Sequence, residues 1–396
     1  MEVKPAIETF AKIKVVGLGG SGGSTINEMI RAKIKGVEFV AINTDAQALH
    51  HNQATTKIQI GKTTTRGLGA GMDAEAGQKA AEENQDEIYD NLKGADMVFL
   101  TCGLGGGTGT GSAPVVADIA KDVGALTVAV VTKPFQFEGE ERKRIAEQGF
   151  QQLQEKVDTI ITIPNDRLLQ IIDKKTSLVE AFAIVDDILR QGVQGISDLI
   201  TVPGLVNVDF ADVKAIMQNA GSALMGIGRG SGESRAVEAA KTAIESPLLE
   251  MSIEGAKGIL FTVTGGTDLG MFELNEAAKI ITGTADPDAK IIFGSVINEE
   301  MKDEVKITVI ATGFGEKKPK KIQSETVLPF ASKEEKMPAQ PVPSRFPRPS
   351  ETNVRPRPER RVTPGERDKE PDHSSPGKTK EEEELEIPAF IRKKMM

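Results

Sequence analysis

The stretch TCGLGGGTGTGSAP, residues 101–114, mixes glycines and hydroxyl side chains between two apolar runs. Glycine loses more conformational freedom on folding than any other residue, so such a loop is costly as pure structure. Bare N–H groups at a helix N-terminus bind phosphate, because they and the helix dipole favour negative charge. The hydroxyls of Thr108 and Thr110 add donors. We therefore predict a phosphate-binding loop between a strand ending at Cys102 and a helix beginning near Ser112.

A second glycine-rich stretch, VVGLGGSGGST, ends at Thr25 and follows another strand-like run. Gly17, Gly19 and Gly22 have the G-x-G-x-x-G spacing of dinucleotide-binding folds, and Asp45 follows about 20 residues later. This pattern leaves a nicotinamide-dependent oxidoreductase open as an alternative. One dinucleotide site needs only one such loop, whereas two loops on adjacent strands fit a nucleoside triphosphate.

Three further features near these loops have simpler interpretations. GLGAGMD, residues 67–73, is a third glycine-rich loop that belongs with the other two. GKT at residues 61–63 resembles the end of a P-loop, but Thr56 stands where that motif requires glycine, so there is no Walker A motif. His50 and His51 have no cysteine or third histidine nearby, and we expect no metal site built from side chains.

Composition excludes several classes of protein. The net charge of −9 argues against nucleic acid as a partner, since phosphate-backbone binding requires a basic surface. A single cysteine allows no internal disulfide, which fits a reducing compartment. No apolar run approaches the roughly 20 residues that a membrane-spanning helix needs, so we expect a cytoplasmic protein without direct membrane insertion.

The elements that position these loops follow from apolar patterning. Near-continuous apolar runs alternate with helical patterns in the first half, which is typical of a parallel sheet covered on both faces. The expected strands there are residues 12–17, 37–43, 96–102, 126–132 and 159–164, and the expected helices are 74–92, 112–123 and 140–156. A long helical pattern then runs from Leu178 to about Ile200. Strand-like runs at 258–266, 290–296 and 305–314 predict a second, mixed α+β domain.

The C-terminal part changes character after Gly315. Residues 338–376 contain ten of the 20 prolines, with interleaved charges and few aliphatic side chains, so this segment cannot bury a core. Apolar residues return in EIPAFIRKKMM after a run of glutamates. We expect a disordered linker followed by a short peptide that orders on a partner.

Several motifs together resemble the FtsZ family, the bacterial tubulin-like cell division GTPases. They are GGGTGTG, NTDAQAL, KPFQFEGEER, TIPNDRLL, RQGVQGISDLI and PGLVNVDFADV, and the tail IPAFIRK resembles that family's C-terminal peptide. The match is almost continuous from about residue 12 to 315. It implies a tubulin/FtsZ-like α/β fold: a Rossmann-like GTP-binding domain (1–177), a central helix (178–202), an activation domain (203–316), a linker (317–384) and a partner-binding peptide (385–396).

The same resemblance implies a function. The protein would bind GTP and GDP, with Mg²⁺ on the phosphates, and would hydrolyse GTP to GDP and phosphate when assembled. Subunits would polymerise head to tail into filaments of the division ring, at mid-cell on the inner face of the membrane. The C-terminal peptide would bind an FtsA-like or ZipA-like membrane tether. A filament protein that does not hydrolyse GTP is a weaker alternative.

Family roles transfer onto matching positions here. Gly20 to Ser24 and Gly107 to Gly109 would hold phosphates, Ala70 and Gly71 would approach the γ-phosphate, and Asn165 and Asp186 would face guanine. The full nucleotide-binding set implied is Gly20, Ser21, Gly22, Gly23, Ser24, Asn43, Asp45, Ala70, Gly71, Gly103, Gly106, Gly107, Thr108, Gly109, Thr132, Glu138, Arg142, Asn165, Phe182 and Asp186.

Two of these assignments have competing interpretations. Glu138 and Arg142 would lie near the ribose and phosphates, but their spacing equally fits a helix-surface ion pair. Asp186 would accept hydrogen bonds from guanine N1–H and N2–H₂, yet Asp187 beside it offers the same chemistry. From spacing alone, both aspartates would belong to a solvated helix face.

The catalytic residues implied by the resemblance are Asp209, Asp212 and Asn207. The family's loop inserts into the next subunit's nucleotide site, where two carboxylates orient the attacking water and help to hold a cation. Spacing alone favours another interpretation: Asp209 as a helix N-cap, with Asp212 at the third helical position, near a capping box.

Overall fold

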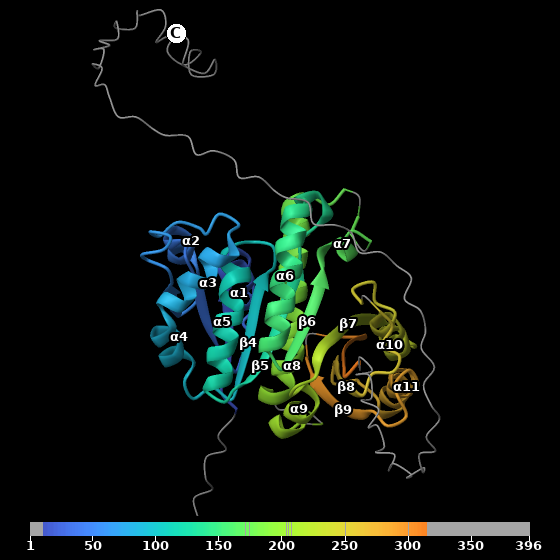
Figure 1. Ribbon diagram of the computed structural model, residues 1–396. Helices are drawn as coiled ribbons and strands as arrows, with labels where there is room; N and C mark the ends of the chain where they lie inside the picture. The colour runs from blue at the N-terminus through green and yellow to red at the C-terminus, as the bar shows by residue number, and fades with distance from the viewer. Residues whose placement is uncertain are drawn as a thin grey trace, which may run out of the picture. The chain divides into compact units, whose positions relative to one another are not determined.

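The computed structural model describes residues 11–314, except 171, 174, 203, 205, 207, 250 and 300. Ten strands form one sheet in the order β3-β2-β1-β4-β5-β6-β7-β10-β8-β9 (Figure 1). The strands are β1 Ile13–Leu18, β2 Val37–Asn43, β3 Thr56–Gln59, β4 Met97–Gly103, β5 Leu126–Lys133, β6 Thr159–Pro164, β7 Gly221–Ser231, β8 Gly258–Gly265, β9 Lys290–Ile297 and β10 Glu304–Thr312.

The strand pairing confirms the predicted fold class. Neighbouring strands from β3 to β7 are all parallel, whereas β10 is antiparallel to both β7 and β8, and β8 is parallel to β9. The helices are α1 Gly19–Arg31, α2 Ala46–His51, α3 Ala74–Glu83, α4 Gln85–Leu92, α5 Thr108–Asp122, η1 Gln136–Glu138, α6 Glu140–Lys156, α7 Asn165–Leu168, α8 Leu178–Thr201, α9 Phe210–Met217, α10 Arg235–Ile244 and α11 Met271–Thr282.

Both faces of the parallel region are covered, which explains why its strands are apolar on both sides. Ile13 and Val15 of β1 belong to the core shared with α1 and α8, whereas Val16 and Leu18 belong to the core shared with α3, α4, α5 and α6. Alternate residues of one strand point to opposite faces, so each strand contributes to both cores. A third core lies between the mixed part of the sheet and α10 and α11.

Two helix boundaries differ from the sequence prediction. The segment 74–92 forms α3 and α4 rather than one helix, because the chain leaves helical geometry at Asn84, whose side chain accepts from the Gly61 N–H at 3.1 Å and donates to Glu87. Helix α5 begins at Thr108, earlier than the predicted Ser112. Helix α6 has the predicted bounds.

Helix α8 packs against both the parallel and the mixed regions of the sheet. A capping box of Ser177 and Glu180 fixes its start. A Cβ at Gly192 would lie 2.9 Å from the sulfur of Met225 in β7, and one at Gly195 would lie 3.1 Å from the Thr308 side chain in β10. These glycines therefore let α8 approach the mixed region closely.

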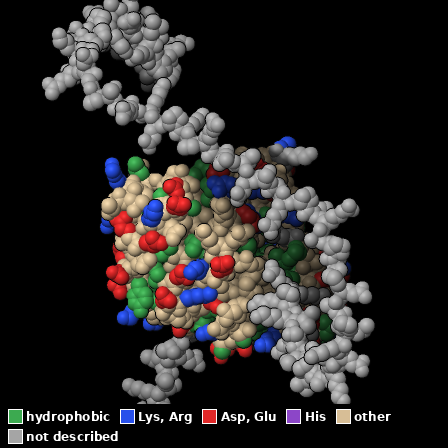
Figure 2. Space-filling view, viewed as in Figure 1, with side chains coloured by type: hydrophobic (Ala, Val, Ile, Leu, Met, Phe, Trp, Pro, Cys, Tyr) green, Lys and Arg blue, Asp and Glu red, His purple; other side chains and the backbone are tan. Residues whose placement is uncertain are grey.

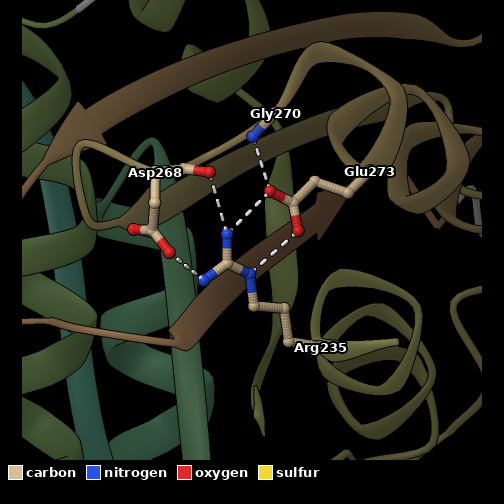
Figure 3. A network of polar contacts seen from close by, with 4 residues as sticks. All are labelled: Arg235, Asp268, Gly270 and Glu273. Atoms are coloured by element: carbon tan, nitrogen blue, oxygen red, sulfur yellow. Dashed lines mark hydrogen bonds and ion pairs between the residues drawn. The ribbon is translucent and has the colours of Figure 1, made fainter. Parts of the chain in front are cut away.

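The loop before α11 is held to α10 by an ionic network (Figure 3). The Arg235 side chain is only 8% exposed and pairs with Asp268 and with both carboxylate oxygens of Glu273, each at 2.9 Å. Glu273 also accepts from the Gly270 N–H. These bonds raise the pKa of Arg235 and lower the pKa values of both carboxyls.

On the surface, acidic and basic side chains are interspersed over the face shown in Figure 2. None of the helices among the described residues is long and apolar enough to cross a bilayer.

Candidate nucleotide-binding site

A cavity of about 530 Å³ lies at the carboxyl ends of β1, β4, β5 and β6. This edge of a parallel sheet is where α/β proteins bind ligands. The lining residues are Leu18, Gly20, Ser21, Ser24, Ala70, Gly103, Leu104, Gly106, Gly107, Thr108, Gly109, Thr132, Pro134, Glu138, Arg142, Asn165, Phe182, Val185, Asp186 and Leu189.

Two helices begin at this cavity without side-chain caps. Neither Leu18, the N-cap of α1, nor Gly107, the N-cap of α5, makes a side-chain capping bond. The first N–H groups of a helix need acceptors, and here no cap supplies one. Both helices have their first residues in the cavity lining. The two N-termini together form a site suited to a polyanion.

The glycines at this edge have two different roles. A Cβ at Gly22, Gly77 or Gly111 would overlap backbone carbonyl oxygens, so these glycines let helices pack closely. A Cβ at Gly20 or Gly106 would meet no protein atom within 4 Å. Both line the cavity. Protein packing therefore does not require glycine at Gly20 and Gly106, and a side chain there would occupy ligand space.

Hydroxyl groups brace the loops around the cavity. Ser21 Oγ accepts from the Gly103 N–H at 2.6 Å, which joins the first turn of α1 to the end of β4. Thr108 bonds Thr44 at 2.8 Å. Thr110 Oγ1 accepts from the Gly105 N–H at 2.9 Å and is not part of the lining. Of the two threonines predicted to add donors, only Thr108 reaches the cavity.

Glu138 and Arg142 form the predicted ion pair and also line the cavity. Arg142 Nη1 lies 3.2 Å from Glu138 Oε2, and both side chains line the cavity. Glu138 Oε1 also accepts from the Phe135 N–H at 2.9 Å. The Glu138 carboxylate is therefore anchored, and it holds a guanidinium group at the cavity wall.

At the end of the cavity formed by α7 and α8, two acceptors lack full complements of partners. Asn165 Oδ1 is buried without a hydrogen-bond partner among the described residues. Asp186 Oδ1 accepts from Thr25 Oγ1 at 2.7 Å, and burial raises the pKa of Asp186 to about 6. Asp187 instead bonds Arg190 and Gln191. Phe182 lines the same wall and packs edge-on against Phe135 at 5.7 Å.

Two family profiles match separate parts of the chain. The profile of the Tubulin/FtsZ family GTPase domain matches residues 12–173, and that of the FtsZ family C-terminal domain matches residues 221–315. An empty FtsZ dimer from M. jannaschii is 48% identical, with a TM-score of 0.75, over 78% of this chain and 89% of that one. A point mutant of M. jannaschii FtsZ is 49% identical over 77% and 91%, with a TM-score of 0.74.

The chain belongs to the FtsZ family. It is accordingly a tubulin-like cell division GTPase that binds GTP and GDP and hydrolyses GTP. CetZ2 from Haloferax volcanii, in a GTPγS-bound protofilament, is 20% identical with a TM-score of 0.66 over 77% of this chain and 95% of that one, which shows a shared fold.

Five residues of the nucleotide-binding set expected for an FtsZ lie outside the cavity lining. Asp45 caps α2 by accepting from the N–H groups of residues 47 and 48, and Asn43 accepts from the Asp45 N–H. Gly22 packs on β4 and Gly23 on Asn52. Gly71, with φ of 60°, follows the lining residue Ala70. The other 15 residues of that set line the cavity.

The sequence analysis missed five lining residues: Leu18, Leu104, Pro134, Val185 and Leu189. Val185 and Leu189 could have been found, because they share one face of α8 with Phe182 and Asp186 at helical spacing. The other three carry no chemical signal of their own.

The two aspartates predicted to be catalytic, Asp209 and Asp212, lie at the other end of the sheet. Helix α9 is opposite the strand ends that form the cavity (Figure 1). A separate cavity there is lined by Ile200, near the end of α8, together with Asp209 and Phe210. Asp186 and Ile200 are 14 residues apart on one helix, which corresponds to about 21 Å. One chain therefore does not bring these aspartates to its own nucleotide cavity. Asn207 is outside the described residues.

The N-cap interpretation is half correct. Asp209 Oδ1 accepts from the Ala211 N–H at 3.3 Å and caps α9. Asp212 forms no capping box, and in the described part of the chain its side chain makes no hydrogen bond or ion pair. Both aspartates are exposed.

Proposed function

We propose that this FtsZ-family GTPase holds GTP in the cavity with its phosphates on α1 and α5 and its guanine at α7 and α8. The observation that carries this orientation is the uncapped start of two long helices at one end of the cavity. At the other end, Asn165 and Asp186 offer acceptors and no cation. A polyanion and a base with adjacent N–H donors fit these two ends.

Guanine is favoured over adenine by the donor pattern. A carboxylate at Asp186 accepts from guanine N1–H and N2–H₂ together, whereas adenine presents an acceptor at N1. Asp187 has both oxygens engaged by Arg190 and Gln191, which supports Asp186 as the residue that contacts the base. Sites built to hydrogen-bond a ligand group reject ligands that lack it by about 10⁴.

Mg²⁺ fits this site when held mainly by the phosphates. Among the described residues, no group of three histidine, cysteine or acidic side chains has metal-binding geometry. Mg²⁺ is often bound by substrate phosphates and water rather than by a protein cage. When bound, it would neutralise phosphate charge. The contribution of the chain is the N–H groups of both helix N-termini and the Arg142 guanidinium.

We further propose that hydrolysis occurs between subunits. Asp209 and Asp212 would lie beside the γ-phosphate of the next subunit and orient a water molecule. Its oxygen attacks the γ-phosphorus, the bond to the β–γ bridging oxygen breaks, and GDP and phosphate result, with the proton of the attacking water released to solvent. Among the described residues Asp212 has no partner that it would have to leave, and the second oxygen of Asp209 is not used by the helix cap. Asn207 would be the third residue of this loop.

Such an active site requires a head-to-tail filament. One end of each subunit contacts the opposite end of the next, a heterologous contact that propagates rather than closes. Exposed apolar side chains support an interface at the nucleotide end: Leu68 is 70% exposed and Phe137 is 63% exposed. The relatives described as a dimer and a protofilament point the same way.

In the cell, we propose division-ring filaments at mid-cell, tethered to the membrane through residues 385–396 by an FtsA-like or ZipA-like protein. The similar solved structures are of archaeal proteins. We therefore define the tether by its function, which is FtsA-like or ZipA-like, and not by a particular protein. We propose the same segments as the sequence predicts: a GTP-binding domain (1–177), a central helix (178–202), an activation domain (203–316), a linker (317–384) and a partner-binding peptide (385–396). The last two segments are outside the described residues.

The decisive experiment measures GTPase activity per molecule against protein concentration. A shared active site predicts activity that rises above an assembly threshold, together with sedimentation in GTP. Asp212→Ala should bind GTP and assemble but hydrolyse it very slowly. Asp118→Ala is the control: it removes a half-exposed acidic side chain of α5 that pairs with Lys156. Activity that stays constant into the monomeric range would show that Asp209 and Asp212 are not catalytic across an interface.

Mixing two defective proteins gives a second test. Asp212→Ala supplies a nucleotide cavity without catalytic carboxylates, and a variant that cannot bind GTP supplies the carboxylates without nucleotide. Restored hydrolysis in the mixture is expected wherever the second protein joins the filament. Recovery would not occur if both functions belonged to one chain.

A further inference from the structure

The hydroxyl of Thr25 connects the two ends of the nucleotide cavity. Thr25 is fully buried in α1, one turn after Ser21. Its Oγ1 lies 3.0 Å from the carbonyl oxygen of Ser21 and 2.7 Å from Asp186 Oδ1 on α8. A hydroxyl has one proton, so only one of these oxygens receives its full hydrogen bond at a time.

The bond to Asp186 differs from ordinary helix back-bonding. Threonine in a helix commonly bonds the carbonyl four residues earlier, and the Ser21 contact is of that kind. The Asp186 contact joins residues 161 positions apart and is the shorter of the two. A carboxylate is also the stronger acceptor. The proton of Thr25 therefore belongs mainly to Asp186.

This bond leaves one carboxylate oxygen available. Asp186 Oδ2 has no hydrogen-bond partner among the described residues, although Asp186 lines the cavity. Neighbouring Asp187 is fully engaged, with Oδ1 on Arg190 and Oδ2 on Gln191. Asp187 is thus bonded through both oxygens to other residues of α8. Asp186 is held through one oxygen only and lies at the cavity wall.

We propose that Thr25 is a positioning residue for base selection: its hydroxyl fixes Asp186 through Oδ1 so that the ionised carboxylate faces the base. This rests on the proposed assignment of guanine to Asp186. Thr25 touches no ligand in this role and acts only through Asp186.

The charges around Asp186 explain why a positioning bond matters. Burial raises the pKa of Asp186 to about 6, the Thr25 bond opposes that rise, and Glu28 on α1 adds to it. Glu138 and Arg142, the other charged side chains in the lining, lie on the η1 and α6 wall as a pair. Loss of the Thr25 hydroxyl therefore raises the pKa of Asp186 toward neutrality.

Protonation of Asp186 changes which base fits. The ionised carboxylate accepts from both N–H groups of guanine. The neutral acid donates one hydrogen bond and accepts another, which suits N1 and the N6 amino group of adenine. The preference for GTP over ATP should consequently decline as pH falls through about 6, the pKa of Asp186. Without the Thr25 hydroxyl, this decline should occur at higher pH.

The test uses the full chain with Thr25→Val, which keeps the shape but removes the hydroxyl, and Thr25→Ser, which keeps the hydroxyl. Dissociation constants for GTP and ATP are measured between about pH 5 and pH 8, a range that extends to both sides of the pKa of Asp186. The ratio of the two constants cancels the titration of the phosphates, which both ligands share.

We expect Thr25→Val to reduce the preference for GTP about tenfold at pH 7 and to move its pH midpoint up by about one unit, the effect of one hydrogen bond to a charged group. Thr25→Ser should behave as the unaltered protein. Thr25→Ala serves the same purpose if the valine variant does not fold.

Failure of the Thr25 proposal can be distinguished from failure of the guanine assignment. An unchanged ratio and pH midpoint in Thr25→Val or Thr25→Ala, with only a lower melting temperature, would reduce Thr25 to a structural link between α1 and α8 and overturn the proposal. Equal affinity of the unaltered protein for GTP and ATP at pH 7 would instead remove the guanine assignment on which the proposal rests.

Discussion

Replacing Gly20 by alanine should stabilise the protein and weaken nucleotide binding at the same time. Gly20 lies in the first turn of α1, and a Cβ built there meets no protein atom within 4 Å. Alanine is favoured over glycine in a helix by about 0.5 to 1 kcal/mol. For a folded region of this size, that gain raises the melting temperature by about 1 to 2 °C without nucleotide.

The same methyl group would be added at a residue of the cavity lining, and we expect it to take up ligand space. Gly20 is part of the lining beside Ser21 and Ser24, where we place the phosphates. A Cβ there holds a phosphate away from the N–H groups of α1, so GTP affinity should fall at least about tenfold, which is about 1.4 kcal/mol. Calorimetric unfolding without nucleotide and a GTP titration measure the two effects separately.

Gly22→Ala is the matched control, two residues along the same helix. Its Cβ would overlap the carbonyl oxygen of Thr101, so we expect a loss of about 1 to 3 kcal/mol of stability. Normal GTP affinity in Gly20→Ala would refute the distinction between ligand-facing and packing glycines. So would a stability loss in Gly20→Ala equal to that in Gly22→Ala.

Three further outcomes are expected. Arg235→Ala should lower the free energy of unfolding at pH 7 by about 2 to 3 kcal/mol, because two carboxylates lose their cation, whereas Arg31→Ala, from an exposed pair, should change it little. Since the pKa values of both carboxyls are lowered by folding, the Arg235 contribution is complete above about pH 4.5 and is lost as pH falls further, which urea unfolding at two pH values would reveal. Cys102 is buried with its pKa raised to about 12, so alkylation at pH 8 should require denaturant, as mass spectrometry can check. Deletion of residues 385–396 should leave GTPase activity unchanged and abolish tether binding in a pull-down.

The parallel half of the fold was predictable because burial on both faces removes polar residues from its strands. Runs such as 126–132 have few other interpretations. The break between α3 and α4 was not predictable, because it depends on Asn84 bonding Gly61, a contact between distant segments. The start of α5 was misplaced for a related reason. Glycine disfavours helices in isolation, yet Gly109 and Gly111 lie inside α5, where Gly111 packs against the backbone of α3.

The candidate site was predictable where chemistry dictated composition. Two glycine-rich loops between strands and helices indicate phosphate binding from backbone geometry alone. The function of a particular glycine was not predictable, because Gly20 and Gly22 look alike in the sequence and differ only in what a Cβ would meet. Asp45 shows the same limit: the dinucleotide spacing is present, but its carboxylate caps α2.

The structural role of Asp209 is compatible with the catalytic role that we propose for it. Its Oδ1 caps α9, which fixes the start of the helix and with it the direction of Asp212 one turn later. The cap uses one oxygen and leaves the other for a water molecule or a cation. Asp212 makes no capping box and is exposed without a partner among the described residues, and helix stability does not explain an aspartate there. Capping therefore accounts for the position of the first aspartate and not for the second, which supports our proposal that Asp212 acts at the nucleotide of a neighbouring subunit.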